Sequence, residues 1–166
     1  MSHDGTVVFD GVLADRDAWS AHDRCSIDRA MRLVGTRSVM LIMREAFYGT
    51  RRFDDFAARV GITEAVAAKR LRELVGAGLL ERVPYRQPGQ RTRHEYRLTD
   101  MGRDLLPAAL ALMAWGDRYL GGAHGGPLSM HHAGCGGRVA VTVACEHGHP
   151  VPLEELALQP NWEALR

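Results

Sequence analysis

The sequence predicts an α+β fold that is mainly α-helical, with a two-stranded β-hairpin after a set of short helices. Three observations predict it. Apolar residues recur at helical spacing between residues 25 and 76, in segments separated by glycines. Two alternating stretches between residues 79 and 98 flank a tip rich in proline, glycine and arginine. A longer apolar stretch then follows at residues 100–120. Helix, helix, helix and basic hairpin is the order of a winged helix-turn-helix.

Length and composition place the chain in an ordinary class. A chain of 166 residues forms one domain, or one domain with a small appendage. Its 46% hydrophobic and 25% charged content is that of a soluble globular protein. No apolar run approaches the ~20 residues that cross a membrane, and the acidic N-terminus lacks the apolar region of a secretory signal. We therefore expect a cytoplasmic protein with no membrane partner.

The net charge of +1 is unevenly distributed. Residues 44–97 carry twelve basic and seven acidic side chains, whereas both flanking regions are slightly acidic. A solvated surface would explain this pattern, but the basic residues cluster around one helix and one hairpin, which favours a nucleic-acid partner.

The first half of the chain predicts an N-terminal arm over residues 1–24, with a short helix near 15–21, and then four helices. Helices are expected at 25–34, at 37–47 and at 53–60, and the second is apolar enough to be the central buried one. Gly61 makes the next turn. Thr63 is the expected N-cap of the fourth helix, which ends at Gly76.

The stretch from Thr63 to Gly76 has two usable faces. Its core-facing residues repeat at helical spacing: Ala67, Leu71, Leu74 and Val75. The opposite face is small near its start and basic further on, which suits a helix that lies in the DNA major groove.

The hairpin and the last helix complete the predicted domain, residues 25–120. Strands are expected at 79–83 and 93–98, around a tip at 84–92. Thr99 caps a helix over 100–120, which Pro107 either kinks or divides. The apolar surface of this helix exceeds what one small domain needs. We expect it to pair two copies of the chain, the alternative being that it packs on the N-terminal arm.

The predicted DNA contacts come from the helix start, the preceding arginines and the hairpin: Arg51, Arg52, Thr63, Ala65, Val66, Ala68, Lys69, Arg72, Arg86, Arg91 and Arg93. One alternative is a winged helix that binds a protein partner and no DNA. An enzyme is the other, but the sequence contains no nucleophile elbow, P-loop or paired-carboxylate motif.

The composition changes beyond a glycine-rich linker at 121–127. The segment 128–166 is predicted to be a small β-rich extension, in which Val139, Val141 and Val143 alternate as a strand. Candidate zinc ligands flank that strand: His132, Cys135, Cys145 and either His147 or His149. Gly148 stands where a second CxxC motif would place its last cysteine, so a metal-free hairpin is the alternative to a zinc ribbon.

The run from Cys25 to Tyr119 resembles the HxlR family of bacterial winged-helix regulators, relatives of the MarR group. The matching segments are the helix from Cys25 to Gly35, LIMREAFYGTRRFDDF, KRLRELVGAGLLER and EYRLTDMGRDLLP, followed by AWGD. The resemblance implies a homodimer that binds a roughly palindromic operator, most simply a repressor that responds to a small molecule or a redox signal. Ser38 departs from the pattern, because the family usually has an aromatic residue there.

Cys25 is the candidate redox sensor. A thiol at a helix N-terminus beside Arg24 and Arg29, with His22 close by, favours the thiolate. The resemblance adds that some members of the family sense oxidants or electrophiles through a cysteine at this motif position. The alternative is a small buried residue.

Overall fold

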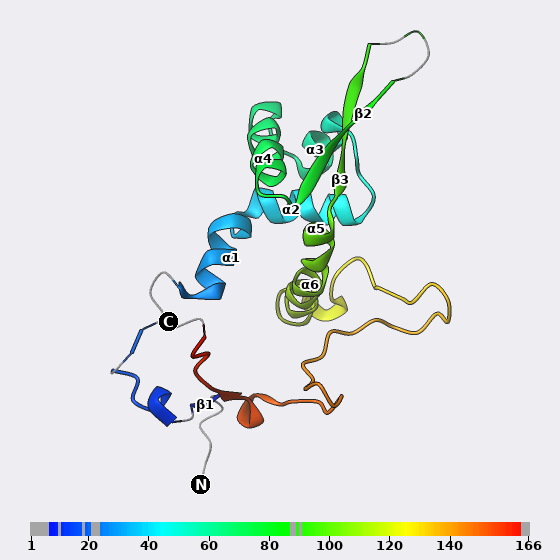
Figure 1. The fold of residues 1–166 in the computed structure, drawn as a ribbon. Helices are drawn as coiled ribbons and strands as arrows, with labels where there is room; N and C mark the ends of the chain where they lie inside the picture. The colour runs from blue at the N-terminus through cyan, green and yellow to red at the C-terminus, as the bar shows by residue number, and fades with distance from the viewer. Residues whose placement is uncertain are drawn as a thin grey trace. The chain divides into compact units, whose positions relative to one another are not determined.

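The computed structural model of the chain describes residues 7–9, 11–17, 19–20, 24–86, 89 and 91–163. The chain divides into two compact units, one formed by residues 26–139 and the other by residues 1–25 together with 140–166. The larger unit holds α1 Ser26–Val34, α2 Arg37–Phe47, α3 Phe53–Val60, α4 Glu64–Gly76, β2 Leu80–Tyr85, β3 Arg93–Leu98, α5 Asp100–Asp104 and α6 Leu106–Leu120 (Figure 1). The predicted mainly α-helical winged helix-turn-helix is confirmed.

Helix α2 is the centre of the larger unit, as predicted. It contacts α3, α4, β3 and α6. Ile42 and Met43 have no exposed surface, and neither do Phe56 of α3 and Leu71 of α4. Full burial of such side chains stabilises the fold by about 1.5–3 kcal/mol each, so these helices are held together mainly by apolar packing.

One buried carboxylate fixes the turn between α2 and α3. Glu45 accepts hydrogen bonds from Arg44 Nη2 at 2.6 Å and from Thr50 Oγ1 at 3.2 Å. The Thr50 backbone N–H also donates to the Glu45 carbonyl at 2.9 Å. Because a buried charge needs such partners, this network orders the loop that introduces the helix-turn-helix.

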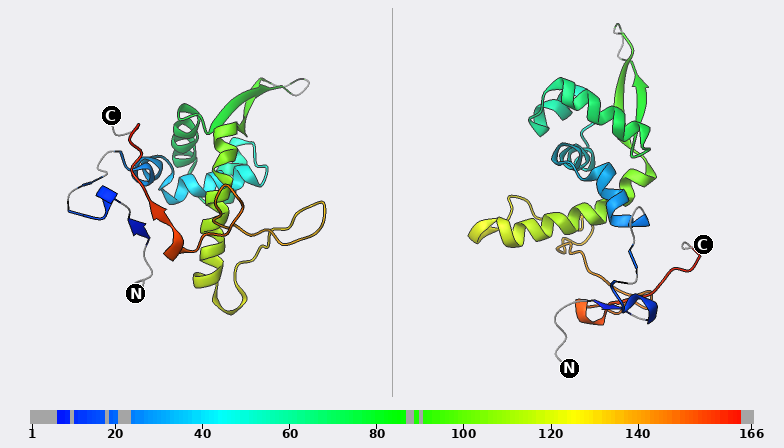
Figure 2. Two further views of the ribbon diagram at one scale, coloured as in Figure 1. Left: turned by 60° about the horizontal axis from the view of Figure 1, so that its bottom comes forward. Right: turned by 90° about the vertical axis from the view of Figure 1, so that its left-hand side faces the viewer.

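The β-hairpin is antiparallel and projects beyond the helices (Figure 2). Its register pairs Leu80 with Leu98 at the base and Tyr85 with Arg93 near the tip. The second strand lies where it was predicted, but the first runs two residues past its predicted end at residue 83. Pro84 does not stop it, because proline is tolerated in a strand that has an open edge.

Pro107 lies in the first turn of a separate helix. Helix α5 ends at Asp104 and α6 begins at Leu106, which confirms the second of the two predicted roles of the proline. The predicted linker at 121–127 contains the 3₁₀-helix Gly122–His124. Within the part of the chain that the structure describes, no helix is both long and apolar enough to cross a membrane.

The smaller unit joins the two ends of the chain. Strand β1, Val8–Phe9, pairs in parallel with β4, Ala157–Leu158, and the Arg16 guanidinium lies 4.0 Å from the centroid of the Trp19 ring. The helix predicted near 15–21 is wrong for the residues of that range that are described, which form a turn and coil.

The valine strand predicted at 139–143 is also wrong. The two ends of this run pair with different segments: Val139 N–H donates to Met130 at 2.9 Å, whereas Val143 accepts from Val151 at 3.0 Å. The alternation therefore has no single partner strand, and all three valines remain exposed.

Candidate nucleic-acid interface

The turn before α4 is built as the sequence predicted. Gly61 ends α3 with a φ of 68°, in the left-handed region that favours glycine. Thr63 has an extended backbone, and its Oγ1 accepts a hydrogen bond from Val66 N–H at 3.3 Å. This cap satisfies one of the backbone donors that a helix start leaves open, and so it fixes the first turn of α4.

The two faces of α4 are also those predicted. Its inner face is fully covered at Ala67 and Leu71, while Lys69 and Arg72 are exposed. The predicted contact residues Thr63, Ala65 and Val66 are exposed as well, but Ala68 is half-buried and lies nearer the flank. Glu64 and Glu73 are exposed on the same helix and reduce its positive charge.

Arg70 connects α4 to α2. Its Nε donates to Ser38 Oγ at 3.2 Å, and its Nη1 donates to Glu73 at 2.8 Å. The hydrogen bond from Arg70 holds the pKa of the Glu73 carboxyl below its ordinary value. Arg70 therefore orients the helix, and Ser38, the departure from the family pattern, is one of its anchors.

Arg51 and Arg52 lie between α2 and α3 and face the hairpin. The Arg51 carbonyl accepts from Tyr96 N–H at 2.8 Å, and the Arg52 guanidinium lies 5.6 Å from the centroid of the Tyr85 ring. Arg52 and Arg93 line one groove of about 640 Å³ between the start of α3 and the hairpin. The structure thus brings two of the predicted backbone-contacting arginines to one surface.

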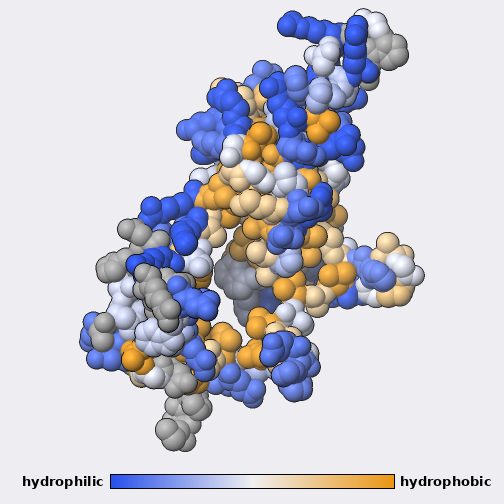
Figure 3. Space-filling view, in the orientation of Figure 1, coloured by the Kyte–Doolittle hydropathy of each residue, from blue (hydrophilic) through white to orange (hydrophobic). Residues whose placement is uncertain are grey.

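The hairpin carries the predicted wing arginines. Arg86, Arg91 and Arg93 are all exposed near its tip. Arg82, which sequence reasoning missed, is exposed on β2 and its Nη2 lies 3.1 Å from His94 Nδ1. Hydrophilic residues predominate around α4 and the hairpin, and hydrophobic residues are more frequent below them toward α5 and α6 (Figure 3).

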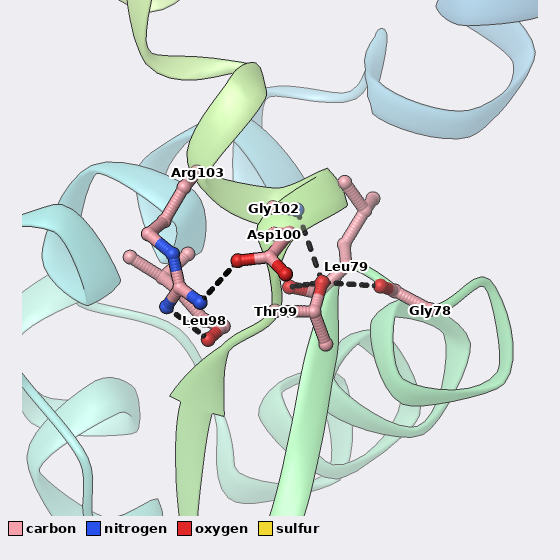
Figure 4. Close-up of polar contacts among 7 residues, drawn as sticks. All are labelled: Gly78, Leu79, Leu98, Thr99, Asp100, Gly102 and Arg103. Carbon is pink, nitrogen blue, oxygen red and sulfur yellow. Dashed lines mark hydrogen bonds and ion pairs between the residues drawn. The ribbon is translucent and has the colours of Figure 1, made fainter.

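Thr99 connects the base of the wing to the turn that follows α4 (Figure 4). Its Oγ1 donates to the Gly78 carbonyl at 2.5 Å and accepts from Gly102 N–H at 3.1 Å. Arg103 closes the junction by donating to the Leu98 carbonyl at 2.7 Å. The position of the wing relative to α4 is therefore set by a short polar network and not by the strands alone.

Cys25 directly precedes α1 and is half-buried, with a free thiol. Of its predicted neighbours, Arg24 and Arg29 are exposed, and His22 lies outside the described residues. The thiol is therefore partly accessible at a helix start.

The candidate zinc ligands divide between the two units. His132 Nδ1 lies 3.1 Å from Cys135 Sγ in the larger unit, whereas Cys145 and His149 belong to the smaller one. No group of three or more potential ligands comes together among the residues that the structure describes. Because a structural zinc ion needs four ligands, the zinc site stays a prediction from the sequence.

Helix α4 has a capped and exposed first turn, follows a tight turn and lies beside a hairpin that carries arginines. These features define a winged helix-turn-helix protein of the DNA-binding class. The chain belongs to the HxlR-like helix-turn-helix family, which it matches over residues 33–124. The predicted family is confirmed, and DNA binding is what this family implies.

Known relatives agree with this assignment. The chain is 43% identical over 137 residues to the HTH-type transcriptional regulator Rv3095 of Mycobacterium tuberculosis, covering 82% of this chain and 85% of the relative. It is similar to the solved transcription-factor candidate PA1607, with a TM-score of 0.75 and 30% identity over 85% of this chain and 98% of that one. It is also similar to the oxidised form of the redox regulator HypR, with a TM-score of 0.52 and 28% identity over 57% and 96% of the two chains. The protein is a transcriptional regulator of HTH type, and its relatives are regulators rather than enzymes.

Proposed function

We propose that the protein is a sequence-specific repressor that binds double-stranded DNA as a homodimer. The observation that carries this proposal is the first turn of α4. Its small residues Ala65 and Val66 are exposed beside a fixed N-cap, so the helix backbone can approach base edges closely. A solvated helix would not need that combination of exposed apolar residues and an adjacent basic wing.

The charged residues of α4 and those of the wing have different parts in the proposed DNA binding. Helix α4 carries three cations, Lys69, Arg70 and Arg72, against Glu64 and Glu73. Because Arg70 is paired with Glu73, α4 alone supplies little attraction for phosphate. Arg86, Arg91 and Arg93 on the wing supply more, because the phosphate backbone dominates affinity. Specificity is then left to α4, and affinity to the wing and to a second subunit.

Exposed apolar side chains on α1 and α6 support the dimer. Ile27 of α1 is 75% exposed, and Trp115 and Leu120 of α6 are 54% and 75% exposed. No residue of α6 is buried, although the helix is largely apolar. Such a surface is typical of a protein interface, and a two-fold dimer would place two α4 helices on successive turns of the operator.

A gel shift and DNase footprint on the upstream DNA of the gene test the proposal. We expect one protected, roughly two-fold symmetric site, with Arg91→Ala weakening binding and lowering its salt dependence. Arg138→Ala is the control, because Arg138 is an exposed arginine of the segment that follows α6. A protein-interaction module would give no protected site, and that result would rule out the proposal.

The dimer is tested by sedimentation at several concentrations. Trp115→Glu places a charge on the exposed face of α6 and should shift the protein to monomer, whereas Lys69→Glu on α4 should leave the dimer unchanged. A wild-type protein that sediments as a monomer at all concentrations would contradict the dimer.

We extend the proposal to a redox response through Cys25. A half-buried thiol at the start of α1 supports it, as does the similarity to a redox regulator. Diamide is reduced to its hydrazine as it oxidises two thiols to one disulfide, and in the proposed dimer the second thiol would be Cys25 of the other subunit. Diamide should release wild-type protein from its operator and should not release Cys25→Ser. The double variant Cys135→Ser/Cys145→Ser is the control and should still be released. Both of these thiols are exposed and could react with diamide without affecting DNA binding. Release of Cys25→Ser by diamide would assign the response to another residue.

A further inference from the structure

A cavity of about 830 Å³ lies between α2, α6 and the segment that follows α6. Its volume is within the range of about 300–1,000 Å³ that small-molecule sites occupy. Apolar side chains dominate its walls: Met40, Leu41 and Phe47 from α2, Leu106, Ala109, Leu110 and Met113 from α6, and Leu128, Met130 and Val139 from the last segment. The cavity lies entirely within the larger unit.

One wall lies beyond the part of the chain that matches the family. The family match ends at residue 124, whereas the wall residues Leu128, Met130 and Val139 come later. A short turn orders this wall: His132 N–H donates to the Gly137 carbonyl at 2.8 Å, and Val139 N–H donates to Met130 at 2.9 Å. The cavity is therefore a feature that the extension adds to the winged helix.

The polar groups on the cavity wall are cationic or neutral. Arg44 and Arg103 line it, and the described residues of its wall include no aspartate or glutamate. Arg44 uses Nε and Nη2 on Glu45, and Arg103 uses Nη1 on the Leu98 carbonyl and Nη2 on Asp100. A guanidinium carries five N–H donors, so these bonds leave each arginine with further donors for an anion.

His131 adds a polar group on the same wall. Its Nδ1 lies 2.9 Å from the Gly136 carbonyl, and its Nε2 lies 3.1 Å from Ser129 Oγ. A carbonyl can only accept, so Nδ1 carries the proton and a neutral ring would accept from Ser129 at Nε2. The hydroxyl and the ring are thereby oriented on the wall.

We propose that this cavity binds an apolar small molecule with one acidic group, and that its binding changes the affinity of the protein for DNA. The apolar walls select the body of the ligand, and Arg44 or Arg103 binds the acid through charge-assisted hydrogen bonds. The effect on DNA binding rests on the proposed function above.

The connection to DNA runs through the base of the wing. Arg103 and Leu98 both line the cavity, and Arg103 donates to the Leu98 carbonyl next to Thr99. An acid that takes the remaining donors of Arg103 adds a second anionic partner to the guanidinium that also holds Asp100 and the Leu98 carbonyl. The ligand thereby acts on the junction that sets the wing relative to α4, and it shifts DNA affinity only to the extent that it binds the two wing positions differently.

Calorimetry on the full-length protein without DNA tests the site, with decanoate, decan-1-ol and decylamine as probes. Decanoate should bind once per subunit, about tenfold or more tighter than decan-1-ol, and decylamine should bind weakest. Ala109→Phe should abolish binding by filling the cavity. Ala111→Phe is the matched control, because Ala111 is exposed on the same helix and does not line the cavity.

A second pair of variants tests the role of the arginine charge without filling the cavity. Arg103→Gln should reduce the preference for decanoate over decan-1-ol, and Arg118→Gln, whose side chain does not line the cavity, should keep it. Equal affinities for acid and alcohol, or unchanged binding in Ala109→Phe, would overturn the inference. An absence of decanoate binding to the dimer would also overturn it, because a second subunit would then fill the cavity.

A gel shift with and without decanoate separates this inference from the proposed function. Decanoate should change operator affinity in wild type and should leave that of Ala109→Phe unaffected. Decanoate binding by a protein that binds no DNA would refute the proposed function and leave the site intact. DNA binding without any decanoate effect would refute the regulatory half of the inference.

Discussion

Gly102 lies where α5 comes closest to the base of the hairpin, and a single methyl group at this position tests that contact. A Cβ atom added to Gly102 would lie 2.1 Å from the Leu79 carbonyl oxygen and 3.2 Å from Leu98 Cδ2. The nearest atom belongs to the backbone and cannot rotate away, so α5 and the hairpin must separate.

The expected net effect of Gly102→Ala is a loss of about 1–2 kcal/mol of unfolding free energy. Overpacking costs about 1–3 kcal/mol, and the better helix propensity of alanine returns up to about 1 kcal/mol. For a chain of this size the melting temperature should fall by about 2–8 °C. Operator affinity should fall as well, because Gly102 N–H donates to Thr99 Oγ1, which holds the wing base.

Thermal and urea unfolding measure this change, with Gly76→Ala as the matched control. Gly76 is the last residue of α4, and a Cβ added there meets no atom within 4 Å. The control should therefore unfold at or slightly above the wild-type temperature. If Gly102→Ala is as stable as Gly76→Ala, the close approach of α5 to Leu79 is not present in solution.

Three further predictions concern α4 and the wing. Thr63→Ala removes the bond to Val66 N–H and should cost about 1 kcal/mol in urea unfolding, whereas Thr63→Ser should keep most of that stability. Arg91→Ala should lower the slope of log affinity against log salt by about 0.9 if the side chain neutralises one phosphate, and an unchanged slope would place Arg91 away from DNA. Arg70→Gln should raise the pKa of Glu73 toward its ordinary value in an NMR titration, because the bond that lowers it is lost. The folded-state pKa of Glu73 is depressed, so the small stabilising contribution of this carboxylate is present at neutral pH and is lost as the pH falls through that folded value. A Glu73 pKa that is the same in Arg70→Gln and in wild type would refute this pairing.

Local signals in the sequence were sufficient for the elements around α4. Gly61 and Thr63 act within a few residues, through a left-handed backbone and a side-chain cap. The spacing of Ala67 and Leu71 defined the buried face, because a helix brings such residues together whatever surrounds it. Pro107 marked a helix start for the same reason, since its effect on the backbone is local.

Signals that depend on a distant partner were insufficient or misleading. The alternation of Val139, Val141 and Val143 predicts a strand only if one neighbour pairs with the whole run, and the two ends pair with different segments. Nothing near Val8 in the sequence indicates that it pairs with Ala157. Pairing between residues this far apart is decided by the packing of the whole unit.

The sequence by itself determined the order of the elements, helix α4 and its two faces, the arginines of the hairpin and the family. Only the tertiary structure decided how they are joined: the bond from Arg70 to Ser38 across 32 positions, the Thr99 junction, and the cavity that the extension closes against α2 and α6. The physical reason is the distance along the sequence over which each interaction acts. Caps, turns and helical periodicity act over a few residues, whereas a junction or a cavity exists only where distant segments are brought together by burial of the core.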